Sequence, residues 1–113
     1  MNKKGRLHIV GTPIGNMGDI TLRALETLKA VDLVACEDTR RTLGLLTHFG
    51  IKKPLVSYYK PKEREGARRV LASLERGDEV ALVTDAGMPC ISDPGALLVK
   101  EARDAGFEVT AEP

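Results

Sequence analysis

VALVTDAGMPCISDPGALLV, residues 80–99, is the stretch that decides the fold. Its first four residues, Val80–Val83, form a short and continuous apolar run, which is typical of a strand buried on both faces of a parallel sheet. A loop with glycines and prolines follows, and Asp93 and Pro94 are the usual N-cap and first residue of a helix. The stretch therefore predicts a strand, a loop and a helix in this order.

Similar apolar runs occur elsewhere in the chain. Leu7–Val10 and Leu33–Cys36 are short runs of the same kind and predict two more buried strands. Residues 54–59 and 107–111 are weaker strand candidates. The sequence therefore predicts five strands.

Stretches with helical spacing separate these runs. We expect one helix over residues 19–30 and a second over residues 40–48. A third helix should stop at Gly77, and a fourth should begin with Asp93 as its cap and stop at Gly106. The side chains expected on the buried faces are Leu22, Leu25 and Leu28 of the first helix, Ala67, Val70, Leu71 and Leu74 of the third, and Leu98, Ala102 and Ala105 of the fourth.

The predicted order is strand then helix, repeated four times, with a final strand. Right-handed crossovers would place helices on both faces of a five-stranded sheet. We therefore predict an α/β fold, a doubly wound, Rossmann-like and mainly parallel sheet in one domain of residues 1–113. The final VTAEP is typical of a strand that reaches a boundary, where an α/β enzyme would normally continue, so we expect this chain to be a fragment of a longer one.

The composition limits the possible classes of partner and compartment. The chain has 17 Lys and Arg against 16 Asp and Glu, so its net charge of +1 attracts neither nucleic acid nor membrane as a whole. Two cysteines without a CxxC spacing fit a reduced, cytoplasmic protein. The first apolar run is too short for a signal peptide or a membrane span. His8 and His48 have no partners at metal-ligand spacing, so no metal site is expected.

The residues that directly follow each strand are candidates for a ligand site, because open α/β sheets bind ligands outside the carboxyl ends of their strands. After the first strand comes GTPIGNMGD, residues 11–19, whose three glycines allow tight turns and close approach of the backbone to a ligand. The segment has neither the GK[ST] of a Walker loop nor the GxGxxG dinucleotide spacing. It is either a ligand-binding loop or a tight strand-to-helix turn.

Carboxylates and guanidinium groups follow the second strand. Glu37 and Asp38 precede Arg40 and Arg41 at the expected start of a helix. In one interpretation Asp38 or Thr39 caps this helix and the arginines pair with the carboxylates. In the other, a carboxylate accepts hydrogen bonds from a ribose and an arginine contacts a phosphate.

Two more candidate sites follow the third and fourth strands. Asp85 and Gly87 come just after the fourth strand, where a small residue leaves room for a ligand and a carboxylate can orient its hydroxyl or amino groups. Tyr58 and Lys60 belong to an aromatic and basic cluster after the third strand. A base could stack on the tyrosine and a phosphate could contact the lysine. The alternative is a half-buried tyrosine at a sheet edge beside a solvated turn.

Three segments carry a resemblance to a known family: GTPIGNMGDITLRALE (residues 11–26), ACEDTRRTLGLL (35–46) and VALVTDAGMPCISDPGALLV (80–99). In this order and spacing they resemble the N-terminal domain of bacterial small-subunit ribosomal RNA ribose 2'-O-methyltransferases, within the tetrapyrrole (corrin/porphyrin) methylase superfamily. The resemblance implies an enzyme of two α/β domains that binds S-adenosylmethionine between them. It also implies methyl transfer to the 2'-hydroxyl of a cytidine in small-subunit rRNA.

The same resemblance implies the residues that contact the cofactor. The first glycine loop would line the active cleft, and the stretch that starts at Asp85 would contact S-adenosylmethionine. The cofactor-binding residues are then Gly11, Thr12, Pro13, Gly15, Asn16, Asp85, Ala86, Gly87, Met88 and Pro89. The family usually has threonine where this chain has Met88, so the family's hydroxyl is missing at this position.

Methyl transfer from a sulfonium is an in-line displacement, so the enzyme has to align the hydroxyl with the methyl group and help remove a proton. By their position, Glu37 and Asp38 are the candidate general bases. The candidate substrate contacts are Arg40, Arg41, Tyr58 and Lys60.

Two other functions stay open on the sequence. One is a methylase of a tetrapyrrole-like small molecule, although the segment EDTRRT, residues 37–42, favours the RNA branch. The other is a non-catalytic module that binds a nucleotide or a protein, which would suit a short chain. The expected partner is small-subunit rRNA, with no membrane. Loss of the second domain would expose apolar surface, so we also expect self-association, for example as a homodimer.

Overall fold

The computed structural model describes residues 4–13, 17–58, 63–85 and 93–112. In this part of the chain five strands alternate with four α-helices. The strands are β1 (Arg6–Thr12), β2 (Leu33–Cys36), β3 (Leu55–Ser57), β4 (Glu79–Asp85) and β5 (Glu108–Glu112). The helices are α1 (Leu22–Ala30), α2 (Thr39–His48), α3 (Glu63–Glu75) and α4 (Asp93–Asp104), and a short 3-10 turn, η1 (Met17–Asp19), precedes α1.

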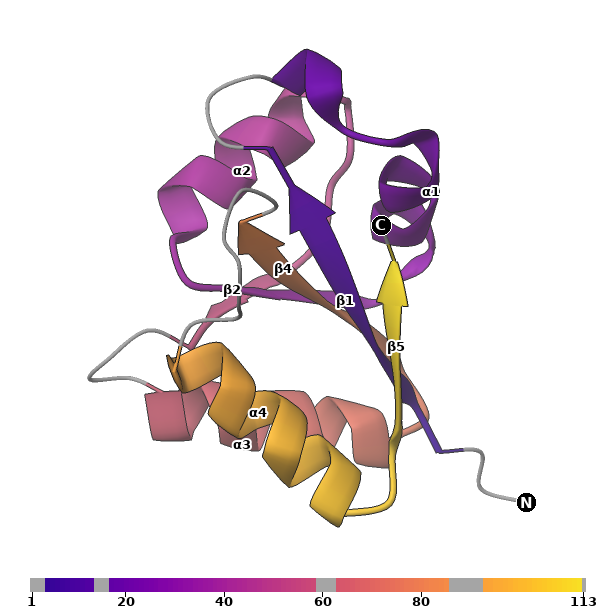
Figure 1. Ribbon diagram of the computed structural model, residues 1–113, viewed down its shortest axis with the longest axis vertical. Helices are drawn as coiled ribbons and strands as arrows, with labels where there is room; N and C mark the ends of the chain where they lie inside the picture. Colours follow the sequence, from indigo (N-terminus) through magenta and orange to yellow (C-terminus); the bar gives the residue numbers. More distant parts are fainter. Residues whose placement is uncertain (1–3, 14–16, 59–62, 86–92, 113) are drawn as a thin grey trace.

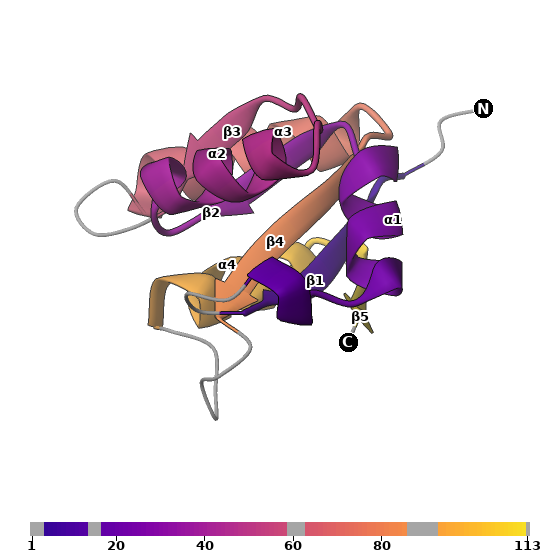
Figure 2. The same ribbon diagram turned by 90° about the horizontal axis from the view of Figure 1, so that it is seen from above.

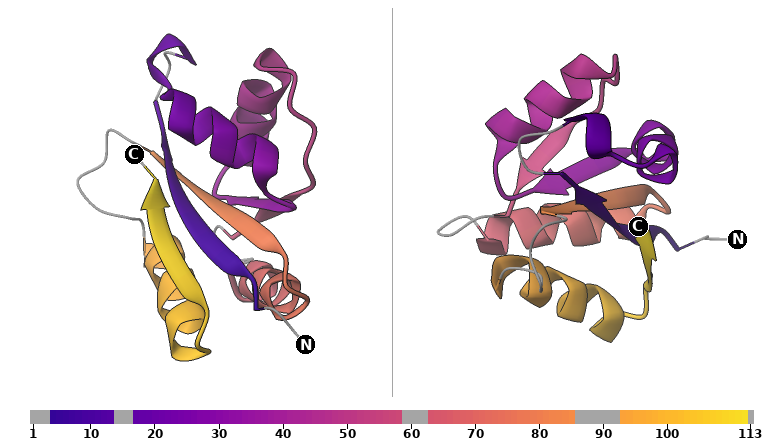
Figure 3. Two further views of the ribbon diagram at one scale, coloured as in Figure 1. Left: turned by 90° about the vertical axis from the view of Figure 1, so that its right-hand side faces the viewer. Right: turned by 45° about the horizontal axis from the view of Figure 1, so that its top comes forward.

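The strands form one parallel sheet in the order β3-β2-β4-β1-β5. The central strand is β4, with β2 and β1 on either side (Figure 1), and β3 and β5 are the edges of the sheet. Helices α1 and α2 cover one face of the sheet, and α3 and α4 cover the other (Figure 3). The structure therefore confirms the predicted doubly wound, Rossmann-like α/β fold.

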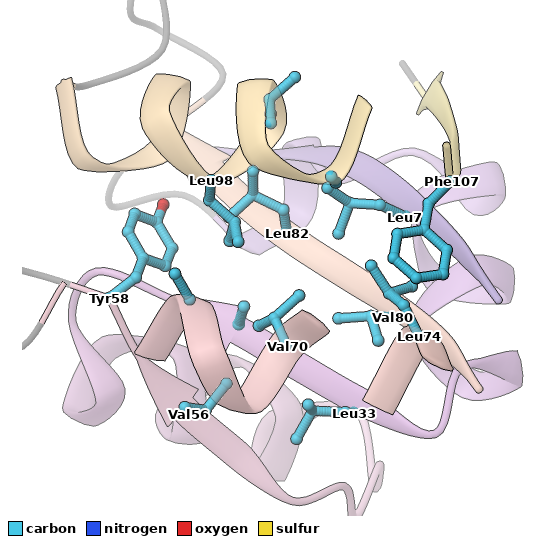
Figure 4. Close-up of a cluster of buried hydrophobic side chains, with 14 residues drawn as sticks. Leu7, Leu33, Val56, Tyr58, Val70, Leu74, Val80, Leu82, Leu98 and Phe107 are labelled. Atoms are coloured by element: carbon cyan, nitrogen blue, oxygen red, sulfur yellow. The ribbon is translucent and has the colours of Figure 1, made fainter. Parts of the chain in front are cut away.

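Each face of the sheet has its own hydrophobic core. Because alternate residues of a strand point to opposite faces, Leu7 and Val10 of β1 reach different cores. Under α3 and α4, the strand residues Leu7 and Leu82 pack with Leu74 and Leu98 of the helices (Figure 4). The core on the other face consists of Val10, Ala24, Leu28, Val31, Val34, Cys36, Leu45, Leu46, Ile51, Ala81 and Val83. The apolar runs predicted as strands thus supply both cores at once.

The prediction of which α1 side chains are buried is wrong for the first of them, Leu22. The helix is capped by Thr21, whose hydroxyl accepts a hydrogen bond from the backbone N–H of Ala24 at 3.0 Å. Ala24 and Leu28 are fully buried, whereas Leu22 is 78% exposed. Successive helical residues turn by about 100°, so Leu22 points roughly away from the direction of Ala24. Leu25 is partly buried against the same core, as expected.

The helix ends agree with the glycine signals. Gly77 and Gly106 have φ angles of 92° and 89°, the left-handed conformation that commonly ends helices. In α4, Leu98 and Ala102 are buried as expected, but the helix ends one residue before Ala105, which is exposed. Among the helices of the described ranges, none is long and apolar enough to span a membrane.

Candidate functional site

The carboxyl ends of β1 and of the central strand β4 lie side by side. In their parallel register Gly11 pairs with Thr84, and Thr12 pairs with Asp85. Both strands are longer than their apolar runs, so Gly11, Thr12 and Asp85 are strand residues and not loop residues as predicted. The two segments that the sequence singled out for cofactor binding therefore leave the sheet from neighbouring positions.

Two hydroxyl groups tie these strand ends together. The hydroxyl of Thr12 donates a hydrogen bond to the backbone oxygen of Thr84 at 3.1 Å. The hydroxyl of Thr84 donates to the backbone oxygen of Val10 at 3.5 Å. Each threonine thus contacts the backbone of the other strand. These bonds add to the ladder that joins the two strand ends, and the sequence pattern does not indicate them.

Several of the expected cofactor-binding residues can be placed on this edge. Gly11, Thr12 and Pro13 are partly exposed there. Asp85 is the last residue of β4. The other expected contacts, Gly15, Asn16, Ala86, Gly87, Met88 and Pro89, lie outside the described residues, as does Lys60.

The end of β2 carries the candidate general bases. Asp38 is the N-cap of α2, and its Oδ1 accepts hydrogen bonds from the backbone N–H groups of Arg40 at 3.0 Å and Arg41 at 3.2 Å. The capping interpretation is therefore confirmed for Asp38. The side chain of Glu37 is exposed, and its backbone oxygen accepts a hydrogen bond from the Ser57 hydroxyl at 3.4 Å. Of the two carboxylates, Glu37 is the one not engaged in capping the helix.

Arg40 and Arg41 lie in the first turn of α2, beside these carboxylates. Both side chains are exposed, and within the described part of the chain neither forms an ion pair. The expected pairing of the arginines with the carboxylates is thus not found there. Both guanidinium groups are available to an anionic ligand at this end of the sheet.

Cys36, the last residue of β2, is buried beneath this region. Burial raises the pKa of its thiol; a hydrogen bond with Thr42 lowers the pKa, and the charge of Asp38 raises it. The net effect is a raised pKa, which keeps the thiol protonated at neutral pH. Cys36 is therefore a packing residue and not a nucleophile.

Tyr58 does not present its ring to a ligand, contrary to the expected stacking role. It follows β3 and is only 2% exposed, and Val56 two residues earlier is also buried in the core under α3 and α4 (Figure 4). Its hydroxyl donates a hydrogen bond to the backbone oxygen of Val83 at 3.1 Å. Its backbone N–H donates to the oxygen of Cys36 at 3.0 Å. Tyr58 thus links the edge of the sheet to the end of β4.

His8 belongs to a polar group of three side chains on the sheet. Its Nε2 lies 2.7 Å from Oε1 of Glu79 on β4, and its Nδ1 lies 3.2 Å from the hydroxyl of Thr110 on β5. The sequence did not indicate either partner, because they come from strands about 70 and 100 residues away. The group connects the three strands on the face covered by α1.

Doubly wound α/β proteins that bind ligands have an open parallel sheet with polar segments at the carboxyl ends of neighbouring strands, as β1 and β4 have here. A family model described as Tetrapyrrole (Corrin/Porphyrin) Methylases matches residues 6–113. The chain belongs to this family.

Proteins named ribosomal RNA small subunit methyltransferase I are similar to this chain. The protein from Mycoplasmopsis pulmonis is 53% identical over 108 residues, which are 96% of this chain and 49% of that protein. The protein from Thermotoga maritima is 53% identical over 109 residues, again 96% of this chain and 49% of that protein. The chain thus spans about half the length of these curated relatives.

A solved structure shows the same fold. The crystal structure of uroporphyrin-III-C-methyltransferase from Thermus thermophilus superposes with a TM-score of 0.72 at 26% sequence identity. The similarity covers 96% of this chain and 47% of that chain.

Proposed function

We propose that this chain is the cofactor-binding part of an S-adenosylmethionine-dependent methyltransferase that, with a C-terminal domain, methylates the 2'-hydroxyl of a cytidine in small-subunit rRNA. The observation that carries the proposal is the pairing of the β1 and β4 ends, from which the two motif segments of the family leave the sheet. The names of the relatives at 53% identity support rRNA as the substrate. The enzyme would act in the cytoplasm, where ribosomal subunits are methylated.

The strand ends suit the chemistry of this cofactor. S-adenosylmethionine has a carboxylate, an amino group and ribose hydroxyls, and it supplies a methyl group on a sulfonium that leaves as a neutral thioether. Gly11, Thr12 and Pro13 are partly exposed at this edge, and Gly11 has no side chain that would keep a ligand away from the backbone. Asp85 at the neighbouring strand end would accept hydrogen bonds from hydroxyl or amino groups.

The chain's own residues would then position the ribose and take up its proton. The 2'-oxygen would take the methyl group that the bound cofactor supplies, and the hydroxyl proton would have to leave. Glu37 would accept this proton, because its carboxylate is exposed near the site end of the sheet while Asp38 caps α2. Arg40 and Arg41 would hold flanking phosphates and so orient the ribose.

This proposal is tested with a longer protein, in which the chain is extended to the full length of its relatives. The measured quantity is methyl transfer to rRNA. Purified small ribosomal subunits are incubated with the enzyme and S-adenosylmethionine, and digested rRNA is analysed by mass spectrometry. We expect 2'-O-methylcytidine from the wild type. Glu37→Gln should lower kcat by about 10²-fold or more, while Asp104→Asn, a matched change on α4, leaves it unchanged. Absence of methyl transfer to rRNA would contradict the proposal.

The similarity to uroporphyrin-III-C-methyltransferase favours one second candidate, a methylase of a tetrapyrrole. The same preparation is therefore offered uroporphyrinogen III in place of ribosomal subunits. Methylation of the tetrapyrrole without methylation of rRNA would favour this alternative. Binding of S-adenosylmethionine without any turnover would instead favour a non-catalytic module.

A further inference from the structure

The nearly neutral net charge of the chain conceals two oppositely charged segments. Residues 37–76 contain ten Lys and Arg and five Asp and Glu, a net charge of +5. Residues 77–113 contain two Lys and Arg and eight Asp and Glu, a net charge of −6. The remaining residues, 1–36, have five and three and a net charge of +2.

The sheet topology places one strand from each of these two segments at opposite edges. The basic segment forms α2, β3 and α3, and β3 is one edge of the sheet. The acidic segment ends in β5, which is the opposite edge. Figure 2 shows α2, β3 and α3 together on one side of the molecule, with β5 on the other side. The fold therefore converts an uneven distribution of charge along the sequence into a charge difference between two edges.

Six cations of the basic segment are exposed and form no ion pair with other described residues. We call this surface the basic edge, and it comprises Arg40, Arg41, Lys52, Arg64, Arg68 and Arg69. By contrast, Arg76 pairs with Asp78 at the far end of α3, and Lys100 pairs with Asp104 on the acidic side.

The basic edge is continuous with the candidate active site. Helix α2 starts directly after β2, and α3 starts after β3, so both helices begin at the carboxyl ends of neighbouring strands. They then run back along opposite faces of the sheet (Figure 1). Because α3 has 13 residues, its exposed side extends about 20 Å from the site.

We infer that the basic edge binds the phosphate backbone of the RNA substrate beyond the reacting nucleotide. Arginine and lysine side chains bind phosphates without reading sequence, and such contacts set the position of a nucleic acid on a protein. The acidic β5 side repels the same polyanion, so the charge difference also sets its orientation. This inference rests on the proposed function, which supplies RNA as the ligand, and it adds the surface along which that RNA runs.

The test replaces two cations of α3 that lie outside the candidate active site. The variant Arg68→Gln/Arg69→Gln keeps helix-forming residues at exposed positions. The control variant Lys29→Gln/Arg103→Gln removes the same charge from exposed positions of α1 and α4. Binding of fluorescein-labelled small-subunit rRNA is measured by anisotropy over a range of salt concentrations, and binding of S-adenosylmethionine by calorimetry.

We expect the α3 variant to bind the RNA about tenfold or more weakly at roughly 0.1 M salt, with a salt dependence reduced by about one to two units of log K per log salt. The control should bind as the wild type does, and both variants should bind S-adenosylmethionine unchanged. If the α3 variant bound the RNA as tightly as the control does, the inferred role of the basic edge in RNA binding would be refuted. The proposed function would not be affected. If poly-glutamate at equal charge concentration displaced the RNA, the basic edge would be a binding surface for an acidic protein. This result would also refute the inference. If the full-length wild-type protein did not methylate rRNA, this would instead count against the proposed function.

Discussion

Gly66 shows at the scale of a single residue how closely α3 packs on the end of β3. A Cβ atom at this position would lie 2.2 Å from the backbone oxygen of Ser57 and 3.0 Å from the Cα of Tyr58. Because both neighbours are backbone atoms, the helix would have to move away from the strand. We predict that Gly66→Ala lowers the free energy of unfolding by about 1–3 kcal/mol, as measured by urea denaturation.

A matched glycine provides the control for this prediction. Gly44 lies inside α2, and a Cβ atom there would have no neighbour within 4 Å. Gly44→Ala should therefore raise the free energy of unfolding by roughly 0.5–1 kcal/mol, because alanine is the better helix former. If both substitutions changed stability by the same amount in the same direction, the close contact at Gly66 would be refuted.

Tyr58 is expected to stabilise the fold through its hydroxyl. Tyr58→Phe keeps the buried ring but leaves the backbone oxygen of Val83 without this donor. We predict a loss of about 1–2 kcal/mol in the free energy of unfolding and no change in RNA affinity. A variant of unchanged stability with weaker RNA binding would restore the stacking role that the sequence suggested.

At the scale of elements, the start of α2 depends on Asp38. Asp38→Ala removes the acceptor of two backbone N–H groups and should cost about 1 kcal/mol of stability in thermal or urea unfolding. Asp38→Asn retains a capping oxygen and should cost much less. If the two variants were equally destabilised, the negative charge of Asp38 and not its capping geometry would be the stabilising feature.

The elements themselves were largely predictable, and the reasons for the errors are physical. Apolar runs such as Leu33–Cys36 identify strands because both faces of a parallel sheet are buried. Hydrophobicity alone does not fix the ends of strands, so the extension of β4 to Asp85 was missed. Hydrophobicity also does not fix the rotation of a short helix about its axis. The predicted burial of Leu22 is therefore wrong, and Ala24 lies on the buried face.

The candidate site was predictable in part from the same kind of signal. The rule that ligands bind at the carboxyl ends of strands selected the segments after β1 and β4, and their pairing places them together. The hydroxyl contacts of Thr12 and Thr84 could not be predicted, because they depend on the register of strands more than 70 residues apart. The predicted stacking role of Tyr58 is wrong because the alternation of buried residues continues one position past β3.

At the scale of the whole molecule, we predict that this chain associates with itself. Leu22, Leu43 and Leu97 are exposed by 78%, 55% and 39% on α1, α2 and α4. Sedimentation velocity should show species larger than a monomer as the concentration rises, because contact would remove apolar surface from water. The variant Leu22→Gln/Leu43→Gln should shift this equilibrium toward the monomer without loss of stability. A strictly monomeric profile of the wild type at high concentration would contradict the prediction.

The central claim is that the paired ends of β1 and β4 bind S-adenosylmethionine. Calorimetric titration of S-adenosylmethionine into this chain and into its Asp85→Asn variant tests the claim most directly, with Asp104→Asn as a control of equal charge. The account predicts that the chain and the control bind the cofactor alike and that Asp85→Asn weakens binding about tenfold, or roughly 1.4 kcal/mol. No binding by the chain, or equal binding by all three proteins, would contradict it.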